Sequence, residues 1–306
     1  MHESRLTFEA LELRLRALLP EEYQDSYEEL QPVSMGSAGL KFDTAGQVAW
    51  NEIWGSFCDL AMAGGPPHKG SLLEPGSRAA IDAQPERYVS VVDEICRGVM
   101  MTTLLDATRS PVAGWIRVEC YSETMAKWLL RAIVMENVAV RRVAVSIDLP
   151  AAPQFRLEKE IKNVITVIAK TAHYWLEHMS RLQQRQIANL LAQMDEESPV
   201  IEPAVSYADW PAGTEDAIAG KIADAIQRQT GLARAEHRYG GWLGIECPSV
   251  RAAVWMMRAL VASNVLSRRE GTVLYLPINP TIDPDGTMVI NAMVRIHGFA
   301  SAKNVL

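Results

Sequence analysis

Apolar residues recur at helical spacing in the first hundred residues and predict helices there. One such pattern runs over Ser4–Leu19 and ends at Pro20, which cannot continue a helix. A second covers Gln47–Ala63 and stops at the Gly-Gly-Pro-Pro run of residues 64–67. A third covers Arg87–Leu105, with its apolar residues on one side. We therefore expect a helical N-terminal segment.

Two later stretches resemble each other. Gly-Trp-Ile-Arg-Val-Glu-Cys-Tyr-Ser begins at Gly114, and Gly-Trp-Leu-Gly-Ile-Glu-Cys-Pro-Ser begins at Gly241. The likeness continues without a gap to Arg142 and Arg269, and 14 of the 29 aligned positions are identical. This density predicts an internal duplication with a spacing of 127 residues.

Each copy predicts a strand, a helix and a second strand. An apolar run enters Glu-Cys, a Ser follows as the helix N-cap, and an apolar-periodic helix comes next. Val140–Leu149 and Thr272–Ile278 are the expected return strands, and a helix over Arg87–Leu105 or Glu215–Gln229 precedes each copy. A strand-helix-strand unit of this kind favours a right-handed crossover onto a shared sheet.

The remaining patterns complete the expected fold. Phe155–Met194 predicts one long helix, or two with a bend, whose apolar stripe needs a partner surface in the two halves or in a second subunit. Met288–Ile296 predicts an additional strand after the turn Pro284-Asp285-Gly286.

The fold class expected from these elements is α/β or α+β, with a duplicated helix-strand-helix-strand unit and a long connecting helix. The expected parts are a helical N-terminal segment over residues 1–86, a first repeat over 87–155, a connecting helix over 156–198 and a second repeat over 199–306.

Composition and charge narrow the class of protein. The 306 residues carry a net charge of -7, which disfavours a phosphate backbone as partner, so we expect no nucleic acid. No apolar run reaches the roughly 20 residues of a membrane span, so no membrane is expected. The four cysteines show no zinc spacing, and nothing marks the chain for export. We expect reduced thiols, a cytoplasmic location and no metal site; the sequence identifies no cofactor.

Cys120 and Cys247 are the candidate catalytic pair. Each ends a predicted strand two residues before a Ser that caps a helix, where exposed amides and the helix dipole lower a thiol pKa. Two such thiols, one per half, match the acid and base of a cofactor-independent racemase or epimerase. The alternative is a small buried residue at a strand-to-helix corner, because free cysteine is often buried and the adjacent Glu119 or Glu246 opposes a thiolate.

Repeated Trp and Arg residues mark a second face of the duplicated helix. Trp128 and Arg131, like Trp255 and Arg258, lie opposite the core stripe, three residues apart. One interpretation is a packed interface between halves or subunits. The other is that Arg131 and Arg258 bind an anionic ligand between the halves. The core stripe itself consists of Ala126, Leu129, Leu130, Ile133 and Val134 with their counterparts.

The stiff loop over residues 63–71 presents His68 and Lys69. Its glycines have a phosphate-loop spacing, but Lys does not follow Gly70, so a nucleoside triphosphate site is rejected. His68 is a candidate general acid or base and Lys69 a candidate substrate contact, against the alternative of a structural turn with a solvated His.

Other polar residues receive structural interpretations. Asn137 and Asn264 fall where each helix should end and fit a left-handed terminating residue. Of Arg141-Arg142 and Arg268-Arg269, at most one per pair serves one site, and solvated ends are expected.

His173 and His178 are five residues apart and therefore off one helical face, whereas His173 and Glu177 are four apart. A lone His and Glu favour a surface or partly buried pair over a metal site.

Two functions are compatible with these features. The first is a cytoplasmic enzyme of small-molecule metabolism with its site between the halves, where Cys120 and Cys247 transfer a proton on a small anionic substrate, with isomerase or epimerase chemistry as its most concrete form. The second is a non-catalytic binding or assembly protein whose repeated Trp and Arg residues are interface anchors, with a homodimer through the 156–194 helix.

Overall fold

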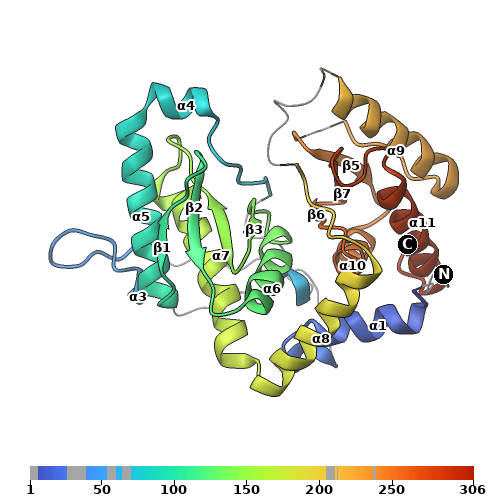
Figure 1. Ribbon diagram of the computed structural model, residues 1–306, viewed down its shortest axis with the longest axis horizontal. Helices are drawn as coiled ribbons and strands as arrows, with labels where there is room; N and C mark the ends of the chain where they lie inside the picture. The colour runs from blue at the N-terminus through green and yellow to red at the C-terminus, as the bar shows by residue number, and fades with distance from the viewer. Residues whose placement is uncertain are drawn as a thin grey trace. The chain divides into compact units, whose positions relative to one another are not determined.

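The computed structural model describes residues 6–25, 39–53, 60–63, 70–204, 211, 213–236 and 239–306. They fall into two compact units (Figure 1). The inserted unit comprises residues 20–185, and the outer unit comprises residues 1–19 and 186–306. Helix α8 (Arg181–Glu197) carries the chain from one into the other. No described helix is long and apolar enough to span a bilayer.

The inserted unit is an antiparallel sheet covered by helices. Its strands β1 (Ala107–Arg109), β2 (Trp115–Glu119), β3 (Arg141–Val143) and β4 (Ser146–Pro150) lie in the order β1-β2-β4-β3. Helices α5 (Pro85–Thr103) and α6 (Glu123–Val134) contact the sheet, and α7 (Lys162–His173) packs on both helices. Smaller elements are α2 (Glu21–Gln24), α3 (Trp50–Ile53), η1 (Ala61–Ala63), α4 (Arg78–Ala83), η2 (Leu157–Ile161) and η3 (Tyr174–His178).

The outer unit has a similar arrangement of elements, with three strands described in its sheet instead of four. Strands β5 (Trp242–Glu246), β6 (Arg268–Glu270) and β7 (Val273–Pro277) form an antiparallel sheet in the order β5-β7-β6. Helices α9 (Thr214–Thr230) and α10 (Val250–Val261) contact it, and α11 (Thr287–Ala302) packs on both. Helix α1 (Phe8–Ala17), from the other end of the chain, packs on α10.

The correspondence between the units extends to register. In the inserted unit Trp115 pairs with Pro150, and in the outer unit Trp242 pairs with Pro277, 127 residues further along in each strand. The bounds of β2, α6, β3 and β4 all recur at this spacing in β5, α10, β6 and β7. Mixed helix and antiparallel sheet in each unit place the protein in the α+β class, one of the two expected.

The alternation of apolar and polar residues fixes which face of the sheet meets the helices. Ile116, Val118, Ile147 and Leu149 are fully buried on the helix-covered face, whereas Trp115, Arg117, Ser146 and Asp148 lie on the other face. The stripe predicted for α6 is confirmed, since all of its residues are buried, and Trp128 is buried as well.

The prediction of a single return strand over Val140–Leu149 is wrong, because this segment forms two strands joined by a turn. Ala144 adopts a left-handed conformation (φ 55°), and the chain turns there into the hairpin of β3 and β4. Gly271 (φ 57°) occupies the equivalent turn before β7. As a result β4 is antiparallel to β2 and separates it from β3, although all three share one sheet as expected.

The strand expected over Met288–Ile296 is also wrong, because this segment lies within helix α11. Its buried residues Val289, Met293, Ile296 and Ala300 recur at steps of three and four, which is the helical period. The helix starts because both carboxylate oxygens of Asp283 accept hydrogen bonds from the amides of Met288 (3.1 Å) and Val289 (3.0 Å).

The stretch expected to form one long helix, or two with a bend, consists of two helical segments. Met179 has an extended conformation (φ -97°, ψ 118°) that separates η3 from α8. The apolar stripe of α7 is buried against α5 and α6 of its own unit. It therefore needs no second subunit to cover it, and the homodimer stays a prediction.

Candidate functional site

The two cysteines occupy the same place in each unit. Cys120 follows β2 and Cys247 follows β5, and both thiols are buried. The predicted N-caps are confirmed, because the Ser122 hydroxyl accepts a hydrogen bond from the Met125 amide and the Ser249 hydroxyl accepts one from the Ala252 amide, each at 3.1 Å.

Burial opposes the thiolate form at both positions. Burial and then the negative charge of Glu119 raise the pKa of Cys120 to about 12. Burial and then Glu246 raise the pKa of Cys247 to about 12 in the same way. Burial therefore disfavours ionisation of both thiols, and proton transfer by this pair stays an untested prediction.

The alkylation rate of each cysteine measures how far burial suppresses its thiolate form. In the folded protein at pH 7.5, Cys120 and Cys247 should react with iodoacetamide at least about a thousandfold more slowly than after unfolding in urea, because their thiolate fraction is small and they are buried. Peptide mass spectrometry resolves each site, and the half-buried Cys96, whose pKa burial and Asp93 raise to about 11, should also react slowly in the folded protein. Fast reaction of the pair, with apparent pKa values well below about 8.5, would instead support the thiolate enzyme.

The candidate anion contacts Arg131 and Arg258 are core residues. Arg131 is fully buried, and its Nη1 donates to the Lys127 carbonyl at 2.9 Å, one turn earlier in α6. Beside it, the Trp128 ring packs on Trp175 of the same unit with centroids 5.6 Å apart. Arg258 is buried in the outer unit. The other candidates, His68 and Lys69, lie outside the described residues.

The repeated asparagines end their helices as predicted. Asn137 (φ 59°) and Asn264 (φ 62°) are both left-handed. The Asn264 side-chain amide also donates to the carbonyls of Met194 (2.8 Å) and Ser198 (2.9 Å), at the end of α8. These asparagines therefore have a structural role that accounts for their repetition.

Three of the four repeated arginines of β3 and β6 are not solvated ends, contrary to expectation, whereas the Arg142 side chain keeps 32% of its accessible surface. Arg141 donates to Asp148 at 2.6 and 3.0 Å, and Asp148 also accepts bonds from Arg117 and Ser110. Arg268 is fully buried, with its guanidinium over the rings of Tyr239 (4.4 Å) and Tyr275 (4.2 Å). Asp148 and Tyr275 lie opposite Arg141 and Arg268 across the hairpins, whereas Arg117, Ser110 and Tyr239 come from more distant segments that spacing along the chain could not reveal.

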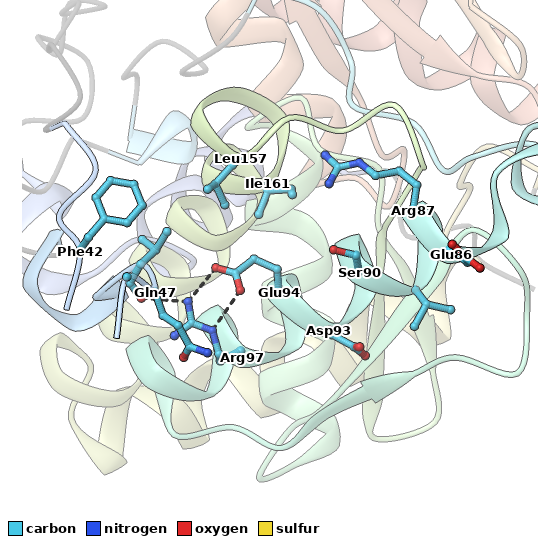
Figure 2. A pocket seen from close by; sticks show the side chains of 13 residues that line it. Phe42, Gln47, Glu86, Arg87, Ser90, Asp93, Glu94, Arg97, Leu157 and Ile161 are labelled. Carbon is cyan, nitrogen blue, oxygen red and sulfur yellow. Dashed lines mark hydrogen bonds and ion pairs between the residues drawn. The ribbon is translucent and has the colours of Figure 1, made fainter. Parts of the chain in front are cut away.

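A groove of about 630 Å³ lies along α5 in the inserted unit (Figure 2). This volume is in the range of sites that hold small molecules. Residues 39–53 form one wall through a tight turn, where the Asp43 carboxylate accepts bonds from the Ala45 and Gln47 amides, both at 2.9 Å. Leu157 and Ile161 of η2 form another wall.

The floor of the groove is held rigid by an ion pair. Figure 2 shows the Glu94 carboxylate bound by the Arg97 guanidinium through two hydrogen bonds, at 2.7 and 3.0 Å. The Trp50 indole donates to Glu94 at 2.8 Å, and Arg97 also donates to the Val48 carbonyl at 2.9 Å. These bonds fasten the 39–53 wall to α5.

Two further carboxylates line the groove, in which Arg87 and Arg97 are the basic residues. Glu86 and Asp93 line it from α5, seven residues and therefore roughly 10 Å apart along the helix. Among the described residues neither forms an ion pair. Val89 lies between them, and Phe42 faces them from the opposite wall; both are substantially exposed. The lining thus combines exposed apolar side chains with the carboxylates of Glu86 and Asp93, and the Arg87 guanidinium, which donates to the Phe155 carbonyl at 2.7 Å, lies at the Glu86 end.

These groove residues do not recur in the outer unit, although the structural residues do. Glu86, Val89, Asp93 and Arg97 correspond at the 127-residue spacing to Gly213, Asp216, Gly220 and Asp224. The buried residues of the same helix keep their apolar character, for example Ile95 and Ile222. Among the described residues, this set of lining side chains is therefore particular to the inserted unit. Sequence reasoning missed it because its walls come from three segments far apart in the chain.

No family model, curated protein or solved structure matches this chain.

Proposed function

We propose that the protein is a non-catalytic binding protein and that its inserted unit holds a short basic segment of a partner protein in the groove along α5. The observation that supports this most is the groove itself, in which Glu86 and Asp93 flank an apolar strip on a rigid floor. This proposal shares its non-catalytic class with the second function compatible with the sequence, but its binding surface is the groove and not the buried Trp128 and Arg131.

The repeated residues support a binding role over catalysis. Ser122 and Ser249 cap helices, Asn137 and Asn264 end them, and Arg131 and Arg258 lie in the cores. Fold requirements account for each of these identities without chemistry. A thiolate enzyme needs ionised cysteines, whereas the pKa of Cys120 and of Cys247 is raised to about 12.

The chemistry of the groove specifies the class of partner. In an extended chain, side chains at i, i+2 and i+4 lie on one side, and the outer two are roughly 13 Å apart. Lysine side chains are flexible enough to reach carboxylates roughly 10 Å apart from that spacing. The expected segment therefore has basic residues at i and i+4 and an apolar residue at i+2.

Binding of the peptide acetyl-Lys-Ser-Leu-Ser-Lys-amide tests this function. The full-length protein is titrated with the peptide while NMR follows the Trp50 indole N–H, which donates to Glu94 in the groove floor. We expect saturable shifts of that signal. The double variant Glu86→Gln, Asp93→Asn should weaken binding about tenfold, which corresponds to about 1.4 kcal/mol.

The controls separate charge complementarity from general attraction to an acidic protein. Asp82→Asn removes an exposed carboxylate of α4 and should leave the affinity unchanged. The peptide with Glu in place of both Lys residues should not bind. Equal binding of the two peptides, or no change at Trp50, would reject the groove as a site for a basic segment.

We propose in addition that the two units descend from one duplicated ancestor. Besides the 14 identities, the parallel bridge of Leu73 to Val138 has its equivalent in Ile201 and Val265. The cytoplasmic location and the small anionic molecule as partner stay predictions.

A further inference from the structure

Two histidines of the inserted unit face each other at the end of η3. The Nε2 atoms of His173 and His178 are 3.0 Å apart. On the far side of each ring lies a carboxylate: Glu22 Oε2 is 3.0 Å from His178 Nδ1, and Glu177 Oε1 is 3.2 Å from His173 Nδ1. Beside them the hydroxyls of Tyr23 and Tyr174 are hydrogen-bonded. None of these residues lines the groove.

A π-helical turn explains how residues five apart meet. Tyr174–His178 forms this turn, and the Met179 amide donates to the Tyr174 carbonyl, five residues back, at 3.1 Å. The sequence prediction assumed an α-helix, which would direct the two rings to different faces. The π-helical turn brings them together instead. Single π-helical turns are rare and occur frequently at functional sites.

Counting protons shows that the gap between the rings requires a positive charge. An ionised carboxylate only accepts hydrogen bonds, so each Nδ1 that faces one carries the N–H of its ring. A neutral imidazole has a single N–H, which leaves a lone pair on each Nε2. Two lone pairs then face each other across 3.0 Å, and either a second proton on one ring or a metal ion between the rings makes the contact favourable.

We propose that His173 and His178 bind a divalent transition-metal ion such as Zn²⁺ through their two Nε2 atoms. Imidazole nitrogen is a preferred ligand of zinc, at roughly 2.0–2.1 Å, so two ligands on a tetrahedral ion lie roughly 3.4 Å apart. The observed 3.0 Å requires only a small rotation of the rings. Histidine ligands usually donate their second N–H to a carboxylate, as Glu22 and Glu177 allow.

The site is open and has few protein ligands. The side chains of His173 and His178 keep 18% and 35% of their accessible surface, which leaves an entry path. Among the described residues no group of three or more His, Cys, Asp or Glu side chains could hold a metal ion, so water completes the coordination. The metal would join α2, at the start of the inserted unit, to η3 near its end.

Isothermal titration of the full-length protein with ZnCl₂ at pH 7.5 tests the site. His173→Ala and His178→Ala should each lose one zinc equivalent relative to the unsubstituted protein. His297→Ala, which removes a histidine of the outer unit, should lose none. Glu22→Gln should weaken that equivalent about tenfold, because the carboxylate orients the ring. Glu21→Gln, its neighbour in α2, is the matched control and should change nothing.

Histidine nitrogen NMR gives a second readout that does not depend on stoichiometry. Without metal, the Nδ1 atoms of both rings should carry the protons, and Zn²⁺ should shift both Nε2 signals. Unchanged Nε2 signals with excess Zn²⁺, or equal zinc binding by His178→Ala and the unsubstituted protein, would overturn the metal site. A proton that is still shared between the two rings at pH 8 in the presence of Zn²⁺ would also overturn the metal site.

Discussion

Lys170→Met is expected to lower the free energy of unfolding of the inserted unit by about 3–5 kcal/mol. Lys170 Nζ lies 2.7 Å from Glu136 Oε1, and the two side chains are 1% and 0% exposed. Methionine matches the length of the lysine stem but leaves the Glu136 carboxylate buried without its counter-charge. Removing one partner of a buried ion pair costs far more than the pair itself contributes.

Once the lysine ammonium is removed, few other groups can stabilise the Glu136 carboxylate. Its Oε1 accepts a bond from the Ala61 amide at 2.7 Å, whereas Oε2 has no hydrogen-bond partner in the part of the chain that the structure describes. Urea unfolding followed by hydrogen exchange of peptides from α6 and α7 measures the effect within the inserted unit. The exposed pair Arg78 and Asp82 supplies the control, because Arg78→Ala should change stability by less than about 1 kcal/mol.

A double substitution separates charge from packing. Glu136→Gln keeps an acceptor for the Ala61 amide, so Glu136→Gln with Lys170→Met should recover much of the loss caused by Lys170→Met alone. Should the double variant be as unstable as the sum of the two single variants, the loss would come from packing and not from the uncompensated carboxylate.

Asp148→Asn is expected to lower the free energy of unfolding at pH 7 by about 3 kcal/mol, because it leaves two arginines around a neutral side chain. Asp148 is fully buried and accepts bonds from Arg117 at 2.8 and 3.1 Å and from Arg141 at 2.6 and 3.0 Å. Asparagine fits the same space but carries no charge, and its amide adds a donor where arginines already donate.

The destabilisation caused by Asp148→Asn should decrease as the pH falls. Burial raises the pKa of Asp148, but the hydrogen bonds from Arg117, Arg141 and Ser110 outweigh it and hold the pKa below its ordinary value. A depressed pKa stabilises the fold above the unfolded pKa of about 3.9, and this contribution is lost as the pH falls through the folded value.

Urea unfolding at a series of pH values from 7 downward measures this dependence. The difference between the unsubstituted protein and Asp148→Asn should therefore shrink in acid. Asp82→Asn, at an exposed ion pair, should show no comparable difference at any pH. A constant difference between Asp148→Asn and the unsubstituted protein down to pH 3 would contradict the ionic origin of the effect.

Local signals in the sequence predicted the local structure well. A Ser before an apolar-periodic run gave the N-caps at Ser122 and Ser249, and an Asn at the end of the run gave the left-handed residues Asn137 and Asn264. These features depend on a few neighbouring residues. Of the polar partners of Asp148, Arg141 lies across the same hairpin, but Arg117 and Ser110 are more than 30 residues away, so no local pattern contains the whole set.

Three errors have distinct physical causes. Met288–Ile296 is short and strongly apolar, and over so few residues alternation resembles the helical period. Ala144 adopts a turn conformation that usually signals itself by glycine, as Gly271 does in the other unit. His173 and His178 meet through a π-helical turn, whose spacing differs from the α-helical one used to place them.

The discontinuity of the outer unit has a consequence for synthesis on the ribosome. Helix α1 is made first, yet its partners come from the other end of the chain: the Phe8 ring lies 5.6 Å from that of Phe299, and Lys303 pairs with Glu12 at 3.1 Å. At roughly 5–20 residues per second, those partners emerge roughly 15–60 s after α1. The inserted unit is complete well before then.

Nascent chains should therefore fold the inserted unit first. During that interval α1 leaves the ribosome with Leu11 and Leu15, which are buried in the finished protein, still uncovered. A circular permutant that begins at residue 20 and carries residues 1–19 after Leu306 through a flexible linker would remove the delay and make the outer unit contiguous.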